Sequence, residues 1–118
     1  MKKTRIAAVS TDGIHVNEHF GKAERFLIYD LGDRISWVEA RTAEPLSVGN
    51  PDHPFDADRF NRVAGVLKDC SKVFVTQIGE TPAAKLKALG IEPVIFNGTI
   101  ADLQKYTVHG NRTGPPIA

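Results

Sequence analysis

The side chains best suited to binding chemistry gather in one polar stretch, Thr11–Lys22. This stretch holds two of the four histidines, His15 and His19, and two carboxylates, Asp12 and Glu18. Imidazole and carboxylate groups coordinate metal ions and exchange protons. Short apolar runs precede and follow the stretch, and a connection of this length between two buried strands is often functional. We therefore interpret Thr11–Lys22 as a binding loop held between two strands.

A small layered α/β domain is expected to position this loop. Gly32-Asp33, between two apolar runs, predicts a type II′ hairpin, so the second and third strands should be antiparallel neighbours. Pro93 places the fifth strand at a sheet edge. Thr81-Pro82 predicts an N-cap followed by the first residue of a helix. The later strands alternate with helices, which predicts parallel crossovers. The expected strands are Arg5–Ser10, Arg25–Leu31, Ile35–Ala40, Lys72–Thr76 and Glu92–Phe96, and the expected helices are Asp56–Asp69, Pro82–Leu89 and Thr99–Lys105.

Two segments do not fit this alternation. Ala43–Phe55 contains three prolines in ten residues, which argues against a helix or a central strand. We expect a flap there, and it carries a third histidine, His53. Residues 109–118 contain two glycines and two prolines without an apolar period. They predict a loose C-terminal tail, and the fourth histidine, His109, lies in it.

The composition is that of an ordinary globular domain. The 118 residues are 42% apolar and 25% charged, with a formal net charge of +1, so no global field indicates nucleic acid or an acidic membrane. The single cysteine, Cys70, excludes an intramolecular disulfide and a Cys-rich metal site within one chain. No apolar run reaches the length of a signal-peptide core or a membrane span, which predicts a cytoplasmic protein.

Five short motifs resemble the nitrogenase iron–molybdenum cofactor biosynthesis family. His-Phe-Gly within the binding loop is the most recognisable, and later Ile-Gly-Glu and Leu-Gly-Ile follow in register. Among small members of this family, the chain is most similar to the orange proteins of sulfate-reducing bacteria. The motifs are Ser10–Gly13, Glu18–Ala23, Phe26–Asp30, Ile78–Glu80 and Leu86–Ile91.

The resemblance implies both a fold and a function. The fold would be three-layered and ribonuclease-H-like, with helices on both faces of a five-stranded mixed sheet. The strand order would be 3-2-1-4-5, with strand 2 antiparallel. Residues 1–108 would form one domain that binds or carries a preformed molybdenum-containing metal–sulfide cluster without catalysing a reaction. A molybdenum–copper sulfide cluster is the first expectation and an iron–molybdenum cofactor-like cluster the second. Implied partners are MinD-type ATPases or cofactor-assembly proteins.

The resemblance also implies where the cluster would bind. In the expected sheet order, the binding loop and the Gln77–Thr81 turn lie at the carboxyl ends of neighbouring central strands, where open α/β sheets bind ligands. His19 matches the family's cluster histidine, and His53 and His15 are further candidate metal ligands. A cluster already saturated with sulfide needs mainly backbone amides and cations from its host. The other candidate residues are Thr11, Asp12, Gly13, Phe20, Gly21, Lys22 and Gly79, and the candidate counter-charges are Lys22, Arg25, Arg41 and Arg62.

Simpler interpretations stay open beside this one. Asp12 could orient His19 or only shape its turn, and Cys70 and Trp37 are expected to have packing roles. A nuclease would need several converging carboxylates, whereas Asp12 and Glu80 are the only acids near the expected site. A protein–protein adaptor without metal is the serious alternative, in which His19 would have no ligand.

Overall fold

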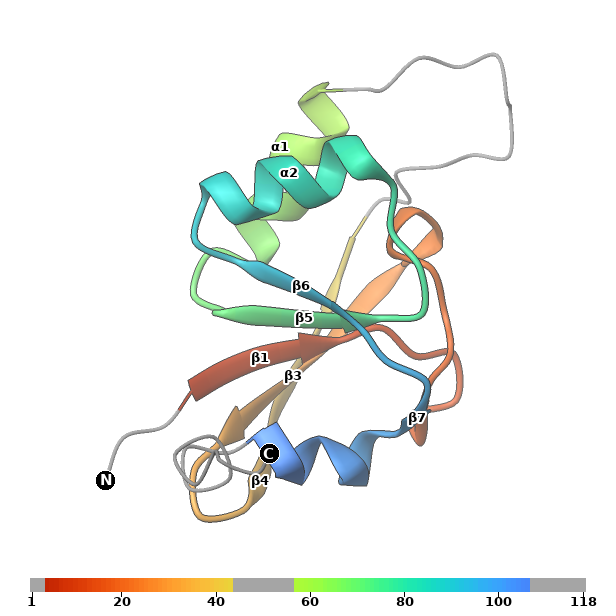
Figure 1. Ribbon diagram of the computed structural model, residues 1–118, viewed down its shortest axis with the longest axis vertical. Coiled ribbons are helices and arrows are strands. Elements are labelled where there is room, and N and C mark those ends of the chain that lie inside the picture. Colours follow the sequence, from red (N-terminus) through yellow and green to blue (C-terminus); the bar gives the residue numbers. More distant parts are fainter. Residues whose placement is uncertain (1–3, 44–56, 107–118) are drawn as a thin grey trace.

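The computed structural model describes residues 4–43 and 57–106. Figure 1 draws these residues as a ribbon and the others as a thin grey trace. The expected flap with His53 and the expected tail with His109 lie outside the described residues.

A five-stranded mixed sheet forms the centre of the molecule (Figure 1). Its spatial order is β4-β3-β1-β5-β6. β3 is antiparallel to both of its neighbours, whereas β1, β5 and β6 are parallel. In chain order this is 3-2-1-4-5 with the second strand antiparallel, the order that the sequence led us to expect. The bounds are β1 Thr4–Ala8, β3 Arg25–Leu31, β4 Ile35–Thr42, β5 Lys72–Val75 and β6 Glu92–Ile95.

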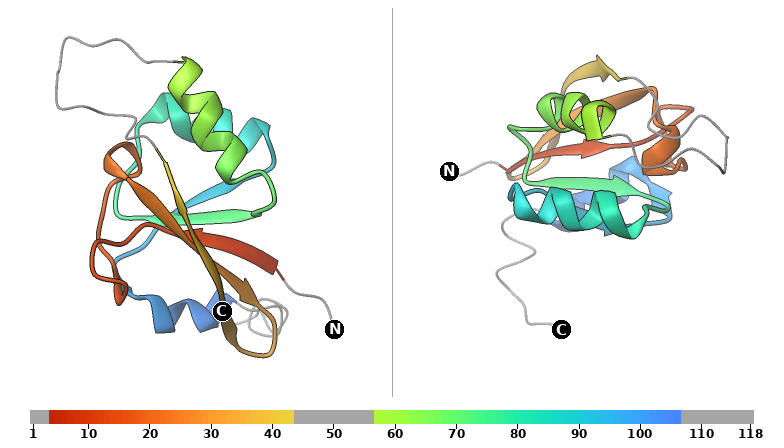
Figure 2. Two further views of the ribbon diagram at one scale, coloured as in Figure 1. Left: turned by 180° about the vertical axis from the view of Figure 1, so that it is seen from behind. Right: turned by 90° about the horizontal axis from the view of Figure 1, so that it is seen from above.

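Helices cover the two faces of this sheet unequally. The α-helices α1 (Ala57–Val66) and α2 (Glu80–Ala88) lie together on one face, and the 3₁₀ helix η2 (Ile100–Tyr106) lies on the other (Figure 2). Parallel connections are right-handed as a rule, and the parallel strands β4, β5 and β6, which α1 and α2 connect, follow one another in one direction across the sheet. Both crossover helices must therefore lie on the same side.

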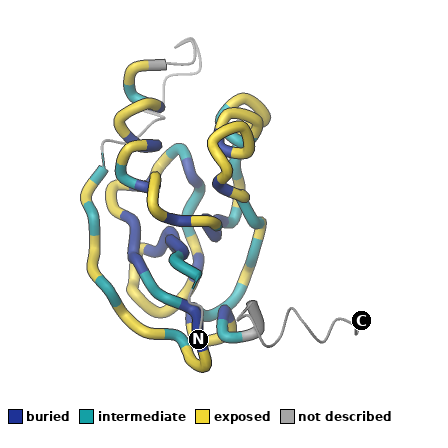
Figure 3. The backbone as a smooth tube through the Cα atoms, turned by 90° about the vertical axis from the view of Figure 1, so that its left-hand side faces the viewer, coloured by how far each residue is buried: buried dark blue, intermediate teal, exposed yellow. Residues whose placement is uncertain are grey.

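Alternating side chains of the central strands supply a core on each face. On the α-helical face, Phe26 and Ile28 of β3 pack with Phe60 of α1 and with Leu67, the residue after α1. On the other face, Leu27 and Leu31 pack with Leu103 of η2. Figure 3 shows the buried positions on the inner strands and the exposed positions on the outer sides of the helices. This double burial explains why β3 reads as a continuous apolar run.

Two local predictions were wrong, the type of the turn at Gly32 and the position of the N-cap of α2. The β3–β4 turn has three residues between the paired Leu31 and Ile35, and Gly32 does not have the positive φ that a type II′ turn requires. Helix α2 begins at Glu80 with Gly79 as its N-cap, so Thr81 is not the cap. Proline is tolerated at Pro82 because the first amides of a helix have no partner within it.

The binding loop contains more regular structure than the sequence indicated. Within Thr11–Lys22 the chain forms a short strand, β2 (His15–Val16), and a 3₁₀ turn, η1 (Phe20–Lys22). β2 pairs antiparallel with β7 (Gly98–Thr99), and Ile100 N donates a hydrogen bond of 2.7 Å to Ile14 O. Pairing with a distant segment fixes the middle of the loop, and local sequence patterns do not reveal such pairing.

In the described part of the chain, no helix combines the length and the apolar character needed to span a membrane.

Candidate functional site

The binding loop and the turn after β5 meet at one edge of the sheet, as expected from the strand order. β1 and β5 are parallel neighbours, so both carboxyl ends reach this edge (Figure 1). The N-terminus of α2 lies there too, because α2 starts directly after the turn. Ala43, at the end of the described β4 region, also lies at this edge, where its amide donates 2.9 Å to Glu24 O.

Ser10 organises the first turn of the loop. Its side chain is 5% exposed, and its hydroxyl accepts hydrogen bonds from the amides of Asp12 (3.3 Å) and Gly13 (2.9 Å). The same hydroxyl donates to Asp12 Oδ1 at 3.1 Å. Gly13 has a φ of 78°, which a residue with a side chain rarely adopts. The backbone conformation therefore requires glycine at this position, and the turn is held by its own hydrogen bonds without a ligand.

Asp12 shapes its turn by holding His15, which is one of the two roles that the sequence left open, and it makes no hydrogen bond with His19. Asp12 Oδ1 accepts hydrogen bonds from the amides of Ile14 and His15, both at 2.8 Å. Asp12 Oδ2 lies 2.8 Å from His15 Nδ1. These bonds, led by the one from the His15 amide, hold the pKa of the Asp12 carboxyl well below its usual range. Asp12 is consequently an ionised turn residue whose charge would repel an anionic ligand.

The amide and the hydroxyl of Thr11 both make hydrogen bonds within the loop. Its amide donates 2.8 Å to Asn17 Oδ1, and Asn17 Nδ2 donates 3.0 Å back to Thr11 Oγ1. Asn17 N further contacts Val9 O at 3.3 Å. The first half of the loop is therefore a closed set of internal hydrogen bonds.

Phe20 anchors the second half of the loop in the core. Its ring is 1% exposed and lies 5.9 Å from the ring of Phe26. Its amide donates a 2.9 Å hydrogen bond to Gln77 O. The ring is therefore unable to contact a ligand at the surface, and Phe20 serves to position the residues beside it.

His19 lies directly beside the turn after β5. Its backbone is extended, with φ −77° and ψ 148°, and it forms a parallel β-bridge with Gln77. Thr76 N donates 3.1 Å to Glu18 O, and His19 N donates 2.9 Å to Glu18 Oε1. The half-buried His19 ring makes no hydrogen bond with any residue that the structure describes. Its backbone is thus fixed while its ring nitrogens remain available to a ligand.

A pocket of about 240 Å³ opens beside His19, and we call it the His19 pocket. Lys22 supplies a cation to its wall, and none of the lining residues that the structure describes is acidic. The turn that forms one wall leads into α2, whose first amides point away from the helix without intrahelical partners. The pocket therefore has an imidazole, a cation and nearby backbone donors, which suit an anion. Its lining residues are His19, Gly21, Lys22, Gln77, Ile78 and Gly79.

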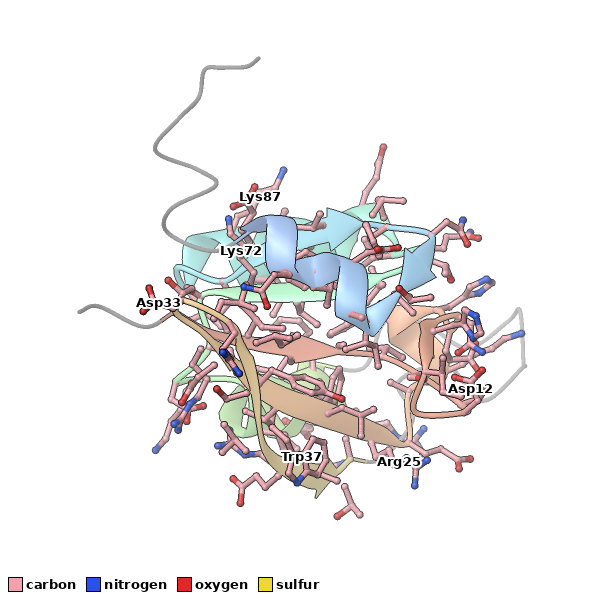
Figure 4. All side chains as sticks on the ribbon, turned by 90° about the horizontal axis from the view of Figure 1, so that it is seen from below. Asp12, Arg25, Asp33, Trp37, Lys72 and Lys87 are labelled. Atoms are coloured by element: carbon pink, nitrogen blue, oxygen red, sulfur yellow. The ribbon has the colours of Figure 1, made fainter. Side chains whose placement is uncertain are left out.

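A second pocket of about 300 Å³ lies on the other side of Lys22, and we call it the Ser10 pocket. Lys22 and Arg25 are exposed there and make no ion pair with any described residue. Two acids, Glu18 and Glu24, line the same pocket and balance their charge. Figure 4 shows Arg25 on the same side of the molecule as Asp12. Because its charges cancel, this pocket suits an anionic ligand less well than the His19 pocket does.

Three other candidate residues lie elsewhere or have a structural role. Arg41 donates to both carboxylate oxygens of Asp69, at 2.7 and 3.0 Å, so it is not a free counter-charge. Gly79 has a φ of −73°, and an added Cβ would meet only ordinary contacts with Pro82. Gly79 thus caps α2, and its backbone conformation does not demand glycine. Arg62 lies on α1, outside the lining of both pockets.

Cys70 and Trp37 have the packing roles expected of them. The Cys70 thiol is buried, and burial together with the charge of Asp69 raises its pKa to about 12. Trp37 is 56% exposed and packs edge-to-face on Tyr29 at 5.4 Å. Across residues 4–43 and 57–106, no three His, Cys, Asp or Glu side chains converge to hold a metal ion. A ligand in the His19 pocket would need most of its metal bonds already made.

Gln77 is the pocket residue whose side chain the sequence did not single out. We expected the end of the preceding strand to lie at the site, but a glutamine at this position matches no known pattern of ligand-binding residues. The bridge to His19 crosses a large separation in sequence, so it could be found only once the fold was known.

Comparison with known proteins identifies the family. Residues 2–107 match the family model described as dinitrogenase iron–molybdenum cofactor. The chain is 34% identical to the FeMo cofactor biosynthesis protein NifB of Chlorobaculum tepidum, over 92% of this chain but only 24% of that protein. It is 31% identical to the protein NifX of Sinorhizobium fredii, covering 95% of this chain and 72% of NifX. The crystal structure of PH0822 superposes with a TM-score of 0.61 at 24% identity, covering 86% of this chain and 87% of that one, which supports the fold. The chain therefore belongs to the dinitrogenase iron–molybdenum cofactor family.

Proposed function

We propose that this protein binds or carries a preformed iron–molybdenum-type metal–sulfide cluster and does not catalyse a reaction. The observation that carries the proposal is the His19 pocket, which joins an unbonded imidazole and Lys22 at a wall whose described residues include no acid. A metal–sulfide cluster is anionic, and its sulfides already fill most metal coordination sites. A site with one imidazole and several hydrogen-bond donors therefore suits such a ligand better than a cage of carboxylates does.

The cluster type can be argued from the relatives. The printed names of NifB and of the family model refer to the iron–molybdenum cofactor. This favours an iron–molybdenum cluster, or a precursor of it, over the molybdenum–copper sulfide expected from the likeness to orange proteins. Proteins that assemble the cofactor are then the natural partners, with MinD-type ATPases as a second possibility.

The fold supports this proposal without suggesting a second activity. We give the five-stranded arrangement the name ribonuclease-H-like because its strand order matches the one that the resemblance implies. Nuclease chemistry does not follow from that name, since fold alone is a poor guide to function. Among the described residues that line the two pockets, the acids are Glu18 and Glu24, and they share the Ser10 pocket with Lys22 and Arg25.

The decisive experiment offers both clusters to the same metal-free protein. Isolated iron–molybdenum cofactor is added to one sample under anaerobic conditions, and tetrathiomolybdate with copper to another. After desalting, the visible spectrum and the contents of molybdenum, iron and copper are measured. We expect stoichiometric molybdenum and iron from the first sample. Stoichiometric molybdenum and copper from the second alone would establish the orange-protein type, and retention of neither would leave the adaptor as the function.

A further inference from the structure

Gln77 stands beside His19 in the wall of the same pocket. The two residues are partners in a parallel β-bridge, and Phe20 N donates a 2.9 Å hydrogen bond to Gln77 O. Partners in a parallel ladder project their side chains to the same side. Both residues line the His19 pocket, which agrees with that geometry.

The Gln77 side chain has no structural task in the described part of the molecule. It is exposed and makes no hydrogen bond with a described residue. By contrast, the side-chain amide of Gln104 accepts from Ile35 N at 2.6 Å and donates to Asp33 O at 2.9 Å. One glutamine therefore joins two parts of the fold, whereas the other offers its amide to the pocket.

We propose that the Gln77 side chain is a second binding group for the cluster and acts together with His19. This inference rests on the proposed function. The Nε2 group donates hydrogen bonds to a sulfide or oxo ligand of the cluster, while His19 binds a metal atom or donates a bond of its own. A carboxamide is neutral, so it adds this contact without adding an acid to a pocket whose described lining has none.

Because the Gln77 amide is neutral, substitutions that add a charge or remove its donor distinguish a binding role from a purely structural one. Gln77→Glu keeps the length of the side chain but places a carboxylate against an anionic ligand. Gln77→Met keeps the length and removes the donor. Neither substitution touches the backbone bonds of Gln77, so both variants should melt at the temperature of the wild type.

The test measures binding of tetrathiomolybdate and of isolated iron–molybdenum cofactor by equilibrium dialysis with molybdenum analysis. We expect Gln77→Met to bind about tenfold more weakly, the loss of one hydrogen bond to a charged group. We expect Gln77→Glu to bind at least about a hundredfold more weakly, because like charges disfavour each other at close range. The visible spectrum of the cluster that Gln77→Met still retains should also differ from that of the wild type. Asn61→Asp, at an exposed position of α1, is the matched control for a change of one charge and should bind like the wild type.

Three outcomes would overturn the inference in different ways. If the wild type binds and both Gln77 variants bind as tightly as the wild type, Gln77 has no part in binding, and the proposed function stands. If Asn61→Asp loses as much affinity as Gln77→Glu, the effect is one of net charge, and Gln77 is not a binding group. If the wild type binds neither probe, the proposed function fails and the role of Gln77 fails with it.

Discussion

Two clusters of polar side chains in this molecule differ in how completely they are paired. Around Asp69, just beyond the last turn of α1, Arg5 and Arg41 both donate to one carboxylate at 2.7–3.1 Å. Arg5 also binds Asp30, and Arg41 also binds Glu39. In the His19 pocket, the imidazole, the Lys22 ammonium and the Gln77 amide have no such partners among the described residues. We call the first group the Asp69 cluster.

The difference shows how charge can serve stability in one place and binding in another. Charges that satisfy each other tie β1, β3, β4 and the end of α1 together. Groups that remain unsatisfied on a fixed backbone are ready for a ligand, and the bonds around Ser10, Phe20 and Gln77 supply that fixed backbone. The loop is therefore rigid where it contacts the protein and open where it faces solvent.

The largest effect should come from removing the anchor of the loop. Phe20→Ala empties a fully buried site next to Phe26 and should lower the free energy of unfolding by about 3–5 kcal/mol. It should also weaken cluster binding, because His19 loses its fixed position. Chemical denaturation followed by dialysis measures both quantities. A loss below about 1 kcal/mol would show that the ring does not anchor the loop.

A smaller effect on stability alone should follow from breaking the Asp69 cluster. Asp69→Asn removes the charge that two arginines share and should cost about 1 kcal/mol, because the groups are partly exposed to solvent. Cluster binding should remain at the wild-type level, since no residue of this cluster lines the His19 pocket. Urea unfolding and dialysis of the variant test this separation. Impaired binding at full stability would contradict it.

The same carboxylate makes stability depend on pH. The bonds from Arg41 and Arg5 hold the pKa of Asp69 well below its value in the unfolded chain, which is about 3.9. Its stabilising contribution is therefore fully present above that value and is lost as the pH falls through the lower folded pKa. The free energy of unfolding should decrease between about pH 5 and pH 2, and less steeply in Asp69→Asn. Equal slopes for the two proteins would exclude this origin.

The smallest effect concerns Cys70, beside the Asp69 cluster. Its thiol is buried, with the pKa raised to about 12, so it should not react with a thiol reagent at pH 8 in the native protein. It should react rapidly once urea unfolds the chain. Absorbance of the released chromophore reports both rates. Fast labelling of the native protein would mean that this end of the molecule opens readily.

The parts of the fold that depend on local pattern were predictable from the sequence. β3 was predicted at its observed bounds because its run is apolar on both faces and ends at Gly32. Pro93 correctly placed β6 at an edge, since proline cannot donate to a neighbouring strand. The start of α2 was misplaced because Thr81-Pro82 fits an N-cap pattern equally well two residues later than the true cap.

The site was predictable only in outline. The strand order brought the loop and the turn to the same edge, and the histidine of His-Phe-Gly pointed to His19. The burial of Phe20 and the bridge from His19 to Gln77 depend on tertiary contacts. Such contacts leave no period or motif in a single sequence.

The central claim is that an iron–molybdenum-type cluster binds in the His19 pocket, and a pair of histidine variants tests it most directly. His19→Ala removes the unbonded ring from the pocket, whereas His15→Ala removes a ring from the same loop that faces Asp12. Both are loaded anaerobically with isolated cofactor, desalted and analysed for molybdenum and iron. We expect the wild type and His15→Ala to retain stoichiometric metal. His19→Ala should retain less than a tenth of it, because the cluster loses one ligand bond. Equal retention by His19→Ala and the wild type would contradict the claim.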